Sequence, residues 1–338
     1  MLEMGSKGRK NGIQVSSLLA TGSSAHARRE VKRMKRHESP PTLTHGDKIY
    51  FPAAGLCKRD YMTYLAQIGE HLVRHLRHRP VTLVRCPDGV AGRRFYQRHL
   101  PPHAPPSLPR REVQGERPLI AIPDVETLLY YGNLGAIEFH AGLHLVQGPQ
   151  AGCPTALTFD LDPSDPRDFE RVRELALCLR EVLRGLGLDG VAKTTGASGL
   201  QVLVPLEEPL PYAVTRPVVN FVAAYCASRW PDLATTERRV RHRGRRVYVD
   251  APQHGPTRTL IAAYSVRAVE KALVSAPITW AELEYGVSPD AFDLHVVPDR
   301  LERVGDWLEL AARHPASRVR AIHDALPPPW RQTRVRSV

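Results

Sequence analysis

Two acidic side chains, Asp160 and Asp162, stand two residues apart at the end of the apolar segment 156–162. That segment is typical of a buried strand, in which side chains alternate between two faces, so both acids should point the same way. Their Cα atoms would lie about 6–7 Å apart, which favours a divalent metal ion. Without a cation, two adjacent carboxylates in a core strand are unfavourable because they repel each other and lose solvation. The pair alone is equally consistent with a strand that ends in a turn at Pro163.

A third acid, Asp250, ends the apolar segment 247–249 in the same way. Alone it would be interpreted as a turn residue, but beside the first pair it would complete a site for two metal ions. Between the acids lies the segment 193–199, Lys-Thr-Thr-Gly-Ala-Ser-Gly, whose backbone amides and hydroxyls favour phosphate groups. This motif is weak, since it lacks the Gly-Lys-Ser or Gly-Lys-Thr of a Walker A loop. Its position between two acid-bearing strands gives it weight.

The elements that would position these residues follow from hydrophobic periodicity and turn signals. Helical spacing of apolar residues predicts helices over 59–78, 125–131, 169–183 and 215–229. Apolar runs predict strands over 81–86, 136–140, 156–162, 200–205 and 246–249. The Pro-rich stretch 101–109 is typical of a surface loop. The sequence therefore predicts a mixed α/β body, and it contains no apolar run long enough to span a membrane.

The chain has 338 residues and a formal net charge of +12. Residues 1–40 hold nine basic and three acidic residues and lack hydrophobic periodicity, so we expect a disordered basic tail. We expect one catalytic domain over 41–305, and a helix with a second basic tail over 306–338. The remaining body is still basic, which favours a polyanionic partner. The five scattered cysteines form no Cys-x-x-Cys pair, which argues against disulfides and structural zinc and favours a cytoplasmic location.

Beyond these elements, the chain resembles the polymerase domain of bacterial DNA ligase D, a member of the archaeo-eukaryotic primase superfamily that serves end-joining repair. The resemblance runs from about residue 43 to about residue 300 and rests on several ordered segments. These segments are 47–52 with Lys58, 79–89, 95–99 (Phe-Tyr-Gln-Arg-His), 134–140 (Leu-Gly-Ala-Ile-Glu-Phe-His), 159–163 (Phe-Asp-Leu-Asp-Pro), 247–250 (Val-Tyr-Val-Asp) and 263–267 (Ala-Tyr-Ser-Val-Arg). So many matches in order make a chance resemblance very improbable.

The resemblance implies an α+β fold, in which a primase-polymerase (RRM-like) catalytic sheet with flanking helices joins a smaller N-terminal α/β subdomain. It implies that the catalytic ligands of two Mn²⁺ or Mg²⁺ ions are Asp160, Asp162 and Asp250. The nucleotide-binding residues that it implies are His140, Thr195, Ser198, Arg258, Ser265 and Arg267. The residues that it implies for a DNA 5′-phosphate and the template are Lys48, Lys58, Arg85, Phe95, Tyr96, Arg98 and Gln253. Without the family, the two lysines would be ordinary surface residues and one member of the aromatic pair would be a core residue.

The loop that ends at Gln201 departs from the usual family pattern, Ser-Gly-x-Lys-Gly-Leu-His. In this chain Thr195 keeps the hydroxyl, but Ser198 stands in place of lysine and Gln201 in place of histidine. Two groups that would carry positive charge are therefore neutral. A charge-assisted hydrogen bond contributes about 1.5–3 kcal/mol, so we expect nucleotide binding to be weaker by one to several decades. Because the acids are intact, we expect altered rather than abandoned nucleotide use.

The first interpretation is an end-joining repair polymerase that adds ribo- or deoxyribonucleotides to a primer 3′-OH at gaps or ends that bear a 5′-phosphate. One alternative is a catalytically weakened or inactive DNA-end-binding module of the same fold, and another is a metal-dependent phosphoesterase that acts on nucleic acid. The chain has no Lys-x-Asp-Gly ligase motif. We therefore expect DNA ends, nucleoside triphosphates, a separate DNA ligase and a Ku-like end-bridging protein as partners, and association with the nucleoid.

Overall fold

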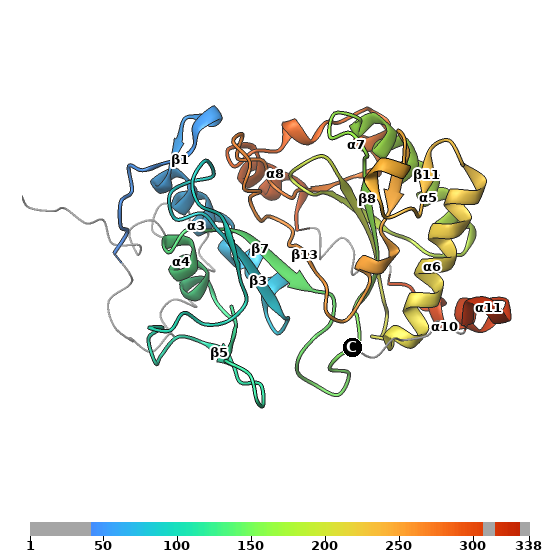
Figure 1. Cartoon of the computed structure of the whole chain (residues 1–338), viewed down its shortest axis with the longest axis horizontal. Coiled ribbons are helices and arrows are strands. Elements are labelled where there is room, and N and C mark those ends of the chain that lie inside the picture. The colour runs from blue at the N-terminus through green and yellow to red at the C-terminus, as the bar shows by residue number, and fades with distance from the viewer. Residues whose placement is uncertain (1–41, 307–314, 332–338) are drawn as a thin grey trace, which may run out of the picture.

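The protein is described by a computed structural model that covers residues 42–306 and 315–331 (Figure 1). The expected tail 1–40 and the end of the expected C-terminal tail, 332–338, lie outside the described residues. The domain boundaries stay predictions. In the part that is described, two separate sheets, each covered by helices, account for most of the fold.

The larger sheet has six strands in the order β11-β12-β8-β10-β9-β14, and all neighbouring pairs are antiparallel except β11 and β12. These strands are β11 (Ala234–Thr235), β12 (Val247–Val249), β8 (Ala156–Asp162), β10 (Leu200–Pro205), β9 (Val191–Thr194) and β14 (Pro277–Ile278). Helices α5 (Phe169–Gly185) and α6 (Tyr212–Arg229) pack on this sheet. Leu157, Phe159 and Leu161 of β8 are fully buried. By alternation, the acids of β8 lie on the opposite face from these core residues.

The smaller sheet has four antiparallel strands in the order β13-β7-β3-β4. They are β13 (Thr259–Ile261), β7 (Ala136–Gly142), β3 (Val81–Arg85) and β4 (Phe95–Gln97). Helices α3 (Lys58–Leu76) and α4 (Val125–Asn133) pack together, and both contact β7. Tyr61, Leu65, Ile68 and Leu72 recur at helical spacing on α3 and are fully buried, so this face anchors the helix to the sheet.

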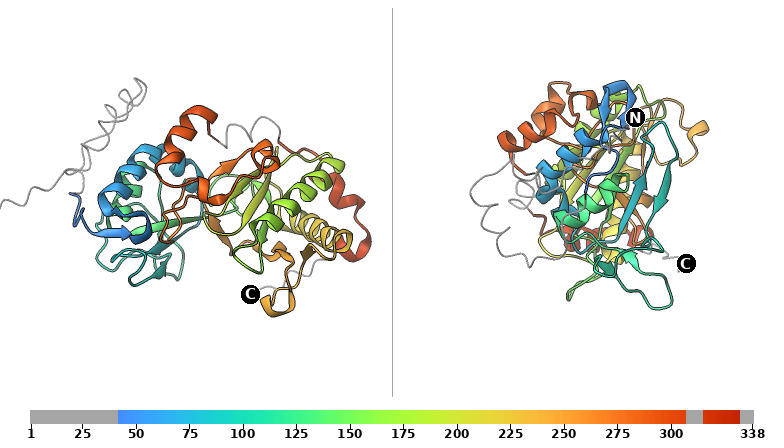
Figure 2. Two further views of the ribbon diagram at one scale, coloured as in Figure 1. Left: turned by 90° about the horizontal axis from the view of Figure 1, so that it is seen from above. Right: turned by 90° about the vertical axis from the view of Figure 1, so that its left-hand side faces the viewer.

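The remaining elements connect these two parts or extend from them. They are β1 (Ile49–Phe51), β2 (Leu56–Cys57), β5 (Arg110–Arg111), β6 (Leu119–Ile120), α7 (Trp280–Glu284), α8 (Val296–Val304), α10 (Val319–Ala325), α11 (Pro328–Arg331) and the 3₁₀ helices η1 (Pro52–Ala54), η2 (Val240–His242), η3 (Ala251–Gln253) and η4 (Pro289–Ala291). Helix α8 contacts α3, and both α10 and α11 contact α6. Figure 2 shows this division from above, with α3 at one end, α5 and α6 at the other, and α8 between them.

The expected α+β organisation is confirmed, and the predicted helices and strands are present, most with ends within one or two residues of the predicted ends. The largest difference is α6, which begins at Tyr212 rather than at residue 215. Pro217 lacks an N–H and is best tolerated in the first turn, so the sequence favoured a later start. The helix instead begins directly after Pro211, whose carbonyl accepts the N–H of Thr215 at 3.1 Å. None of the helices in the described residues is long and apolar enough to cross a membrane.

Candidate active site

Asp250 directly follows β12 and lies opposite Asp160 of the neighbouring strand β8. The antiparallel register that pairs Val249 with Leu161 brings the N–H of Asp250 to the carbonyl of Asp160 at 2.8 Å. On the other side of β8, Gln201 pairs with Asp160, and its Nε2 donates to Asp160 Oδ1 at 3.1 Å. Directly paired residues share a face, so these three side chains form a row across the sheet.

The two acids of β8, Asp160 and Asp162, resist ionisation. Burial, followed by the charge of Asp162, raises the pKa of Asp160 to about 8. Burial and the nearby Asp250 also raise the pKa of Asp162, against the opposing charge of Arg243. A bound cation would relieve this repulsion, and carboxylate oxygens are the ligands that Mg²⁺ and Mn²⁺ prefer, so the donor chemistry fits a metal site.

The side chains are not yet arranged around a single ion. Within the described residues, no three groups of the ligating types converge closely enough to hold a metal as they stand. Asp250 Oδ1 instead accepts a hydrogen bond from Tyr248 at 3.1 Å, and Asp160 is held by Gln201. Metal binding would therefore require these two acids to exchange their present hydrogen bonds for the ion.

Lys193 extends the row on the side away from Asp250. It pairs with Gln201 across β9 and β10, and its Nζ donates to Ser275 Oγ at 2.6 Å. The side chain is almost fully buried, and burial lowers its pKa to about 7 although the charge of Asp160 opposes this shift. Four side chains, two acids, an amide and an amine, therefore form a row across one face of the larger sheet.

The loop between β9 and β10 is fastened by its own first residue. The Thr195 hydroxyl accepts the N–H of Gly199 at 3.2 Å and that of Ala197 at 3.4 Å. Gly196 has a left-handed φ of +70°, and a Cβ there would lie 3.1 Å from Cβ of Arg267. The loop therefore lies against the segment that follows β13, and the half-buried Ser198 is part of it.

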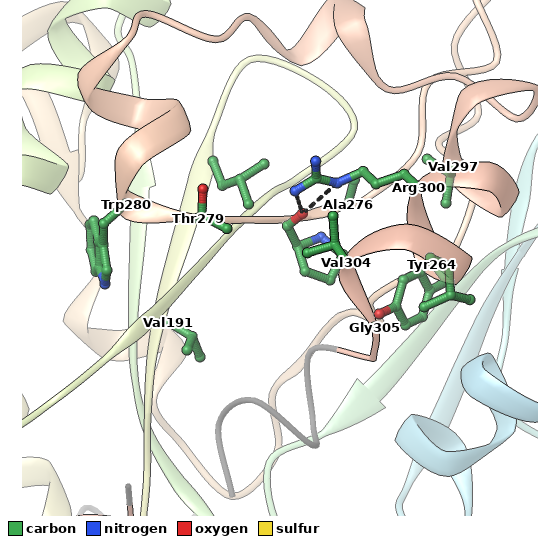
Figure 3. A pocket seen from close by; sticks show the side chains of 12 residues that line it. Val191, Tyr264, Ala276, Thr279, Trp280, Val297, Arg300, Val304 and Gly305 are labelled. Atoms are coloured by element: carbon green, nitrogen blue, oxygen red, sulfur yellow. Dashed lines mark hydrogen bonds between the residues drawn. The ribbon is translucent and has the colours of Figure 1, made fainter. Parts of the chain in front are cut away.

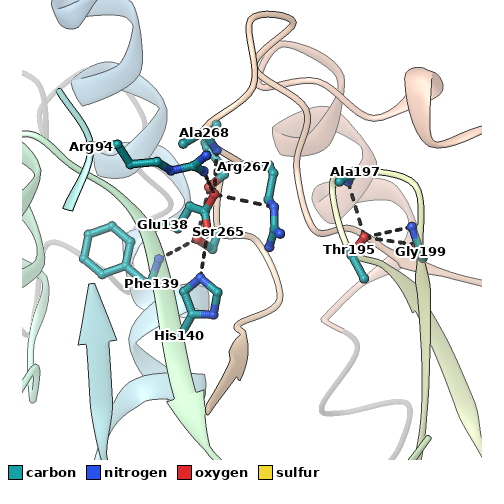
Figure 4. Close-up of polar contacts among 11 residues, drawn as sticks. Arg94, Glu138, Phe139, His140, Thr195, Ala197, Gly199, Ser265, Arg267 and Ala268 are labelled. Carbon is teal, nitrogen blue, oxygen red and sulfur yellow. Dashed lines mark hydrogen bonds and ion pairs between the residues drawn. The ribbon is translucent and has the colours of Figure 1, made fainter. Parts of the chain in front are cut away.

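A basic cluster lies across from this loop, around the buried carboxylate of Glu138 (Figure 4). Glu138 and His140 share the face of β7 opposite to Phe139, and the Glu138 Oε2 to His140 Nε2 distance is 2.7 Å. Oε1 accepts from Arg94 at 2.7 Å and pairs with Nε of Arg267 at 3.5 Å. Burial opposes ionisation of Glu138, but the hydrogen bond from His140 and the charge of Arg267 bring its pKa down to about 2.

The other residues predicted to bind nucleotide are dispersed. Ser265 is fully buried, and its hydroxyl accepts the N–H of Phe139 at 2.8 Å, so it fastens β7 to the segment that follows β13. Its neighbour Tyr264 has an unusual φ of +69°, and its carbonyl accepts from the hydroxyl of Tyr64 on α3 at 2.7 Å. Arg258 is exposed on the turn that leads into β13.

Lys48 and Lys58 line a pocket of about 250 Å³ together with Arg85, at the outer end of the smaller sheet. Lys48 Nζ donates to Asp88 Oδ1 at 2.8 Å, whereas Lys58 Nζ donates to backbone carbonyls, including that of Asn133 at 2.6 Å. Burial and the charge of Lys48 lower the pKa of Lys58 to about 8. The structure therefore brings this predicted pair together in one concave site.

The predicted aromatic pair on β4 is split between two environments. Phe95 is half-buried beneath the guanidinium of Arg85, which lies 5.1 Å from its ring centroid. Tyr96 is 73 % exposed and free to stack. Arg98 is also exposed on this edge, and Gln253 lies in η3 directly after the acid row.

Sequence reasoning missed Glu138, Arg94 and Lys193. Glu138 and His140 have the same two-residue spacing as the acids of β8, so strand alternation was a usable signal. Arg94 gave no signal, because its contact with Glu138 joins positions 44 residues apart. Arg243 was also missed; it lies 4.1 Å above the ring of Tyr248, and its charge opposes the rise in the pKa of Asp162.

A second pocket, of about 200 Å³, lies beside β14 and α8 and differs in character (Figure 3). Its lining is largely apolar, with Val191, Ile278 and Leu301 among the residues. The guanidinium of Arg300 at its edge is bound to the carbonyl of Pro277 and to Glu282. This pocket therefore offers packing surface rather than reactive groups.

Comparison with known proteins identifies relatives of most of the described body. Residues 57–308 match the model of the LigD primase-polymerase domain. The chain is 32% identical over 275 residues to the bifunctional non-homologous end joining protein LigD of Bacillus subtilis, covering 80% of this chain and 44% of that protein. It is 32% identical over 283 residues to the multifunctional non-homologous end joining DNA repair protein LigD of Mycobacterium tuberculosis, covering 80% of this chain and 37% of that protein.

A solved structure, the polymerase domain from Mycobacterium tuberculosis ligase D in complex with DNA, superposes with a TM-score of 0.74 at 32% identity. The match covers 82% of this chain and 100% of that chain. The chain thus spans less than half the length of the two curated relatives, whereas its match to the solved structure covers the full length of that structure's chain. On its sequence, its fold and the matched span, the chain belongs to the LigD primase-polymerase family.

Proposed function

We propose that this protein is an end-joining repair polymerase that adds nucleotides to a primer 3′-OH at gaps or broken ends bearing a 5′-phosphate. The observation that carries the proposal is the row of Asp250 and Asp160 on one sheet, close to the basic cluster around Glu138 on the other. Arg267 of that cluster is near enough for its charge to act on Asp162. Carboxylates on one side and cations on the other are what a metal-bound triphosphate requires.

Each half of the site has its own task. Asp160, Asp162 and Asp250 would hold two Mn²⁺ or Mg²⁺ ions. Such ions would lower the pKa of the 3′-hydroxyl and neutralise phosphate charge. The triphosphate would be bound by five of the residues predicted for it, namely His140, Thr195, Ser198, Arg258 and Arg267. The predicted Ser265 is fully buried and would instead support β7 through its bond to Phe139. The primer 3′-hydroxyl then gives up its proton to water and its oxygen forms a bond to the α-phosphorus, while the bond from that phosphorus to the bridging oxygen breaks and pyrophosphate leaves with the electron pair.

The DNA would lie along the smaller sheet. Lys48 and Lys58 in their shared pocket would bind the 5′-phosphate of the downstream strand. Tyr96 is exposed enough to stack on a base, with Phe95 behind it. Template contacts would come from the remaining predicted residues, Arg85, Arg98 and Gln253. A ligase and a Ku-like end-bridging protein at the nucleoid would be the partners that complete the repair.

A gap-filling assay tests this proposal. The substrate is a duplex with a one-nucleotide gap and a 5′-phosphate, supplied with Mn²⁺ and labelled ribo- or deoxyribonucleotides in separate reactions. The wild-type protein is expected to extend the primer, whereas Asp160→Asn removes a ligand charge and should abolish extension. Asp165→Asn is the matched control, because this exposed acid in the turn after β8 is paired only with Arg167 in the hydrogen bonds described. No extension by wild type, or equal extension by Asp160→Asn, would contradict the proposal.

One observation favours the alternative of a DNA-end-binding module without catalysis. The loop from Thr195 to Gln201 contains no basic side chain, and the Thr195 hydroxyl is bound within the loop. Tight binding of the 5′-phosphorylated duplex, without any stabilisation of the protein by nucleotide and Mn²⁺, would support this alternative. Cleavage of the DNA in the absence of nucleotide would instead indicate a phosphoesterase.

A further inference from the structure

Arg94 directly precedes strand β4, which carries the aromatic pair Phe95 and Tyr96. Its side chain reaches Glu138 in the nucleotide half of the proposed site. Arg94 lies in the connection between β3 and β4, directly before Phe95. Its guanidinium donates to Glu138 Oε1 at 2.7 Å, yet its side chain remains 45% exposed. One face of the guanidinium is therefore anchored while the rest is accessible to a ligand.

Glu138 connects three separate segments through one carboxylate. Arg94 comes from the β3–β4 connection, His140 from β7 itself, and Arg267 from the segment after β13. The N–H of Ala268 completes the set at 3.0 Å. Because Glu138 is only 2% exposed, its charge is devoted to these donors rather than to solvent. Figure 4 shows the four groups converging on it.

The charges of this cluster do not balance. One carboxylate faces two guanidinium groups, so the cluster has a net positive charge even with His140 neutral. Across the gap, the loop from Thr195 to Gln201 adds no cation. A triphosphate between these walls therefore finds its positive charge on the side of Glu138.

We propose that Arg94 is a triphosphate-binding residue of this chain and that Glu138 is the positioning residue that holds it beside His140 and Arg267. The inference rests on the proposed function, since it assigns two further residues to the same nucleotide site. Arg94 supplies there the charge that the opposite loop lacks. It also joins the nucleotide site to the base-stacking strand, since Phe95 and Tyr96 follow it directly.

Two explanations of Glu138 make opposite predictions. If the carboxylate merely sits near the phosphates, Glu138→Gln removes a repulsive charge and tightens nucleotide binding. If it positions the three basic groups, the same substitution releases Arg94 and Arg267 and weakens binding. The direction of the change thus separates positioning from simple proximity.

The experiment measures ATP affinity with Mn²⁺ by calorimetric titration, without DNA, for wild type, Arg94→Ala, Arg94→Lys, Glu138→Gln and the double variant Arg94→Ala/Glu138→Gln. We expect Arg94→Ala and Glu138→Gln each to weaken binding about tenfold or more, since each removes a charge-assisted contact. Arg94→Lys should lose less. The double variant should bind ATP only slightly more weakly than the weaker-binding single variant. The combined loss of affinity should be far smaller than the product of the two single losses, because the two residues act as one unit.

Lys271→Ala provides the matched control, because this exposed cation four positions after Arg267 pairs only with Asp290 in the ion pairs described. It should leave ATP affinity unchanged. Melting temperatures of all variants are measured in parallel, and Arg94→Ala keeps the test decisive if Glu138→Gln fails to fold. In gap filling, Arg94→Ala should raise KM for the nucleotide more than it lowers kcat.

The inference is overturned if Arg94→Ala binds ATP within twofold of wild type, or if Glu138→Gln binds it more tightly. It is also overturned if the wild-type protein binds no ATP. Failure of the proposed function is a different result, namely a wild-type protein that binds ATP but extends no primer. In that case the affinities of the variants still decide the roles of Arg94 and Glu138.

Discussion

The α-carbon of Gly199 stands against the carbonyl of Leu161, so that a Cβ at Gly199 would lie 2.8 Å from that oxygen. The loop between β9 and β10 and the strand β8 therefore touch without spare room, and Gly199→Ala must push them apart. We expect the free energy of unfolding to fall by about 1–3 kcal/mol. Denaturant unfolding measures it, and Gly185→Ala, which has open space at the end of α5, serves as the control. Equal stability of the two variants would show that the contact is not tight.

A lysine at position 198 should strengthen nucleotide binding. Ser198 is half-buried on a loop that contributes no cation, and Ser198→Lys adds one facing the triphosphate. A new charge-assisted contact should tighten ATP binding about tenfold. Ser198→Met has a similar length without charge and should change little. If both variants bind ATP equally, charge at this position does not limit nucleotide use.

Lys58 should make recognition of the 5′-phosphate pH-dependent. Its pKa is lowered from 10.5 to about 8 by burial and by Lys48, so the amine loses its charge as the pH rises above about 8. The part of DNA affinity that depends on the 5′-phosphate should therefore fall over that range. Fluorescence anisotropy with phosphorylated and unphosphorylated duplexes isolates this part. Lys58→Arg keeps its charge and should remove the decline, and a decline of the same size in both proteins would exclude Lys58 as its source.

The same shift predicts a change in stability. The folded chain holds the Lys58 proton less tightly than the unfolded chain, in which the lysine keeps its ordinary pKa of 10.5. Unfolding therefore takes up a proton between about pH 8 and 10.5, and the contribution of this residue to the free energy of unfolding rises with pH in that window. Lys58→Met should flatten this contribution, which unfolding titrations at several pH values would detect.

Tyr96 should contribute to DNA binding and not to folding. It is 73% exposed, and stacking of a base on an aromatic ring contributes about 1–3 kcal/mol. Tyr96→Ala should thus weaken binding of a gapped duplex by about fivefold to a hundredfold or more at constant ionic strength, with no change in melting temperature. Tyr285→Ala removes a tyrosine that is 92% exposed elsewhere and should bind DNA normally. Unchanged affinity in Tyr96→Ala would remove this residue from the DNA surface.

Features that depend on local periodicity could be predicted from the sequence. Strand alternation places Asp160 and Asp162 on one face, and apolar spacing sets the ends of α3 and α5 within two residues. The assignment of Asp250 as a partner of Asp160 drew its strength from the family resemblance, because the residues around Asp250 do not reveal that β12 pairs with β8. The structure supplies that register.

Contacts between distant segments could not be predicted in this way. Arg94 meets Glu138 because β4 and β7 both flank β3, and the sequence near Arg94 contains no sign of this order. Ser265 shows the opposite problem, because a hydroxyl beside a predicted site can equally serve the fold. The hydrogen bond that Ser265 accepts from the N–H of Phe139 is known only once β7 and the segment after β13 are placed side by side.

The acids belong to one sheet and the basic cluster to the other, so the affinity for a nucleotide that contacts both should depend on the spacing between the sheets. Residues that set this spacing then matter to catalysis without touching a ligand. Tyr64 acts on the basic side of the site, because its hydroxyl donates to the carbonyl of Tyr264, three residues before Arg267. A bound triphosphate would in turn brace the acid-bearing sheet against the basic cluster of the other sheet.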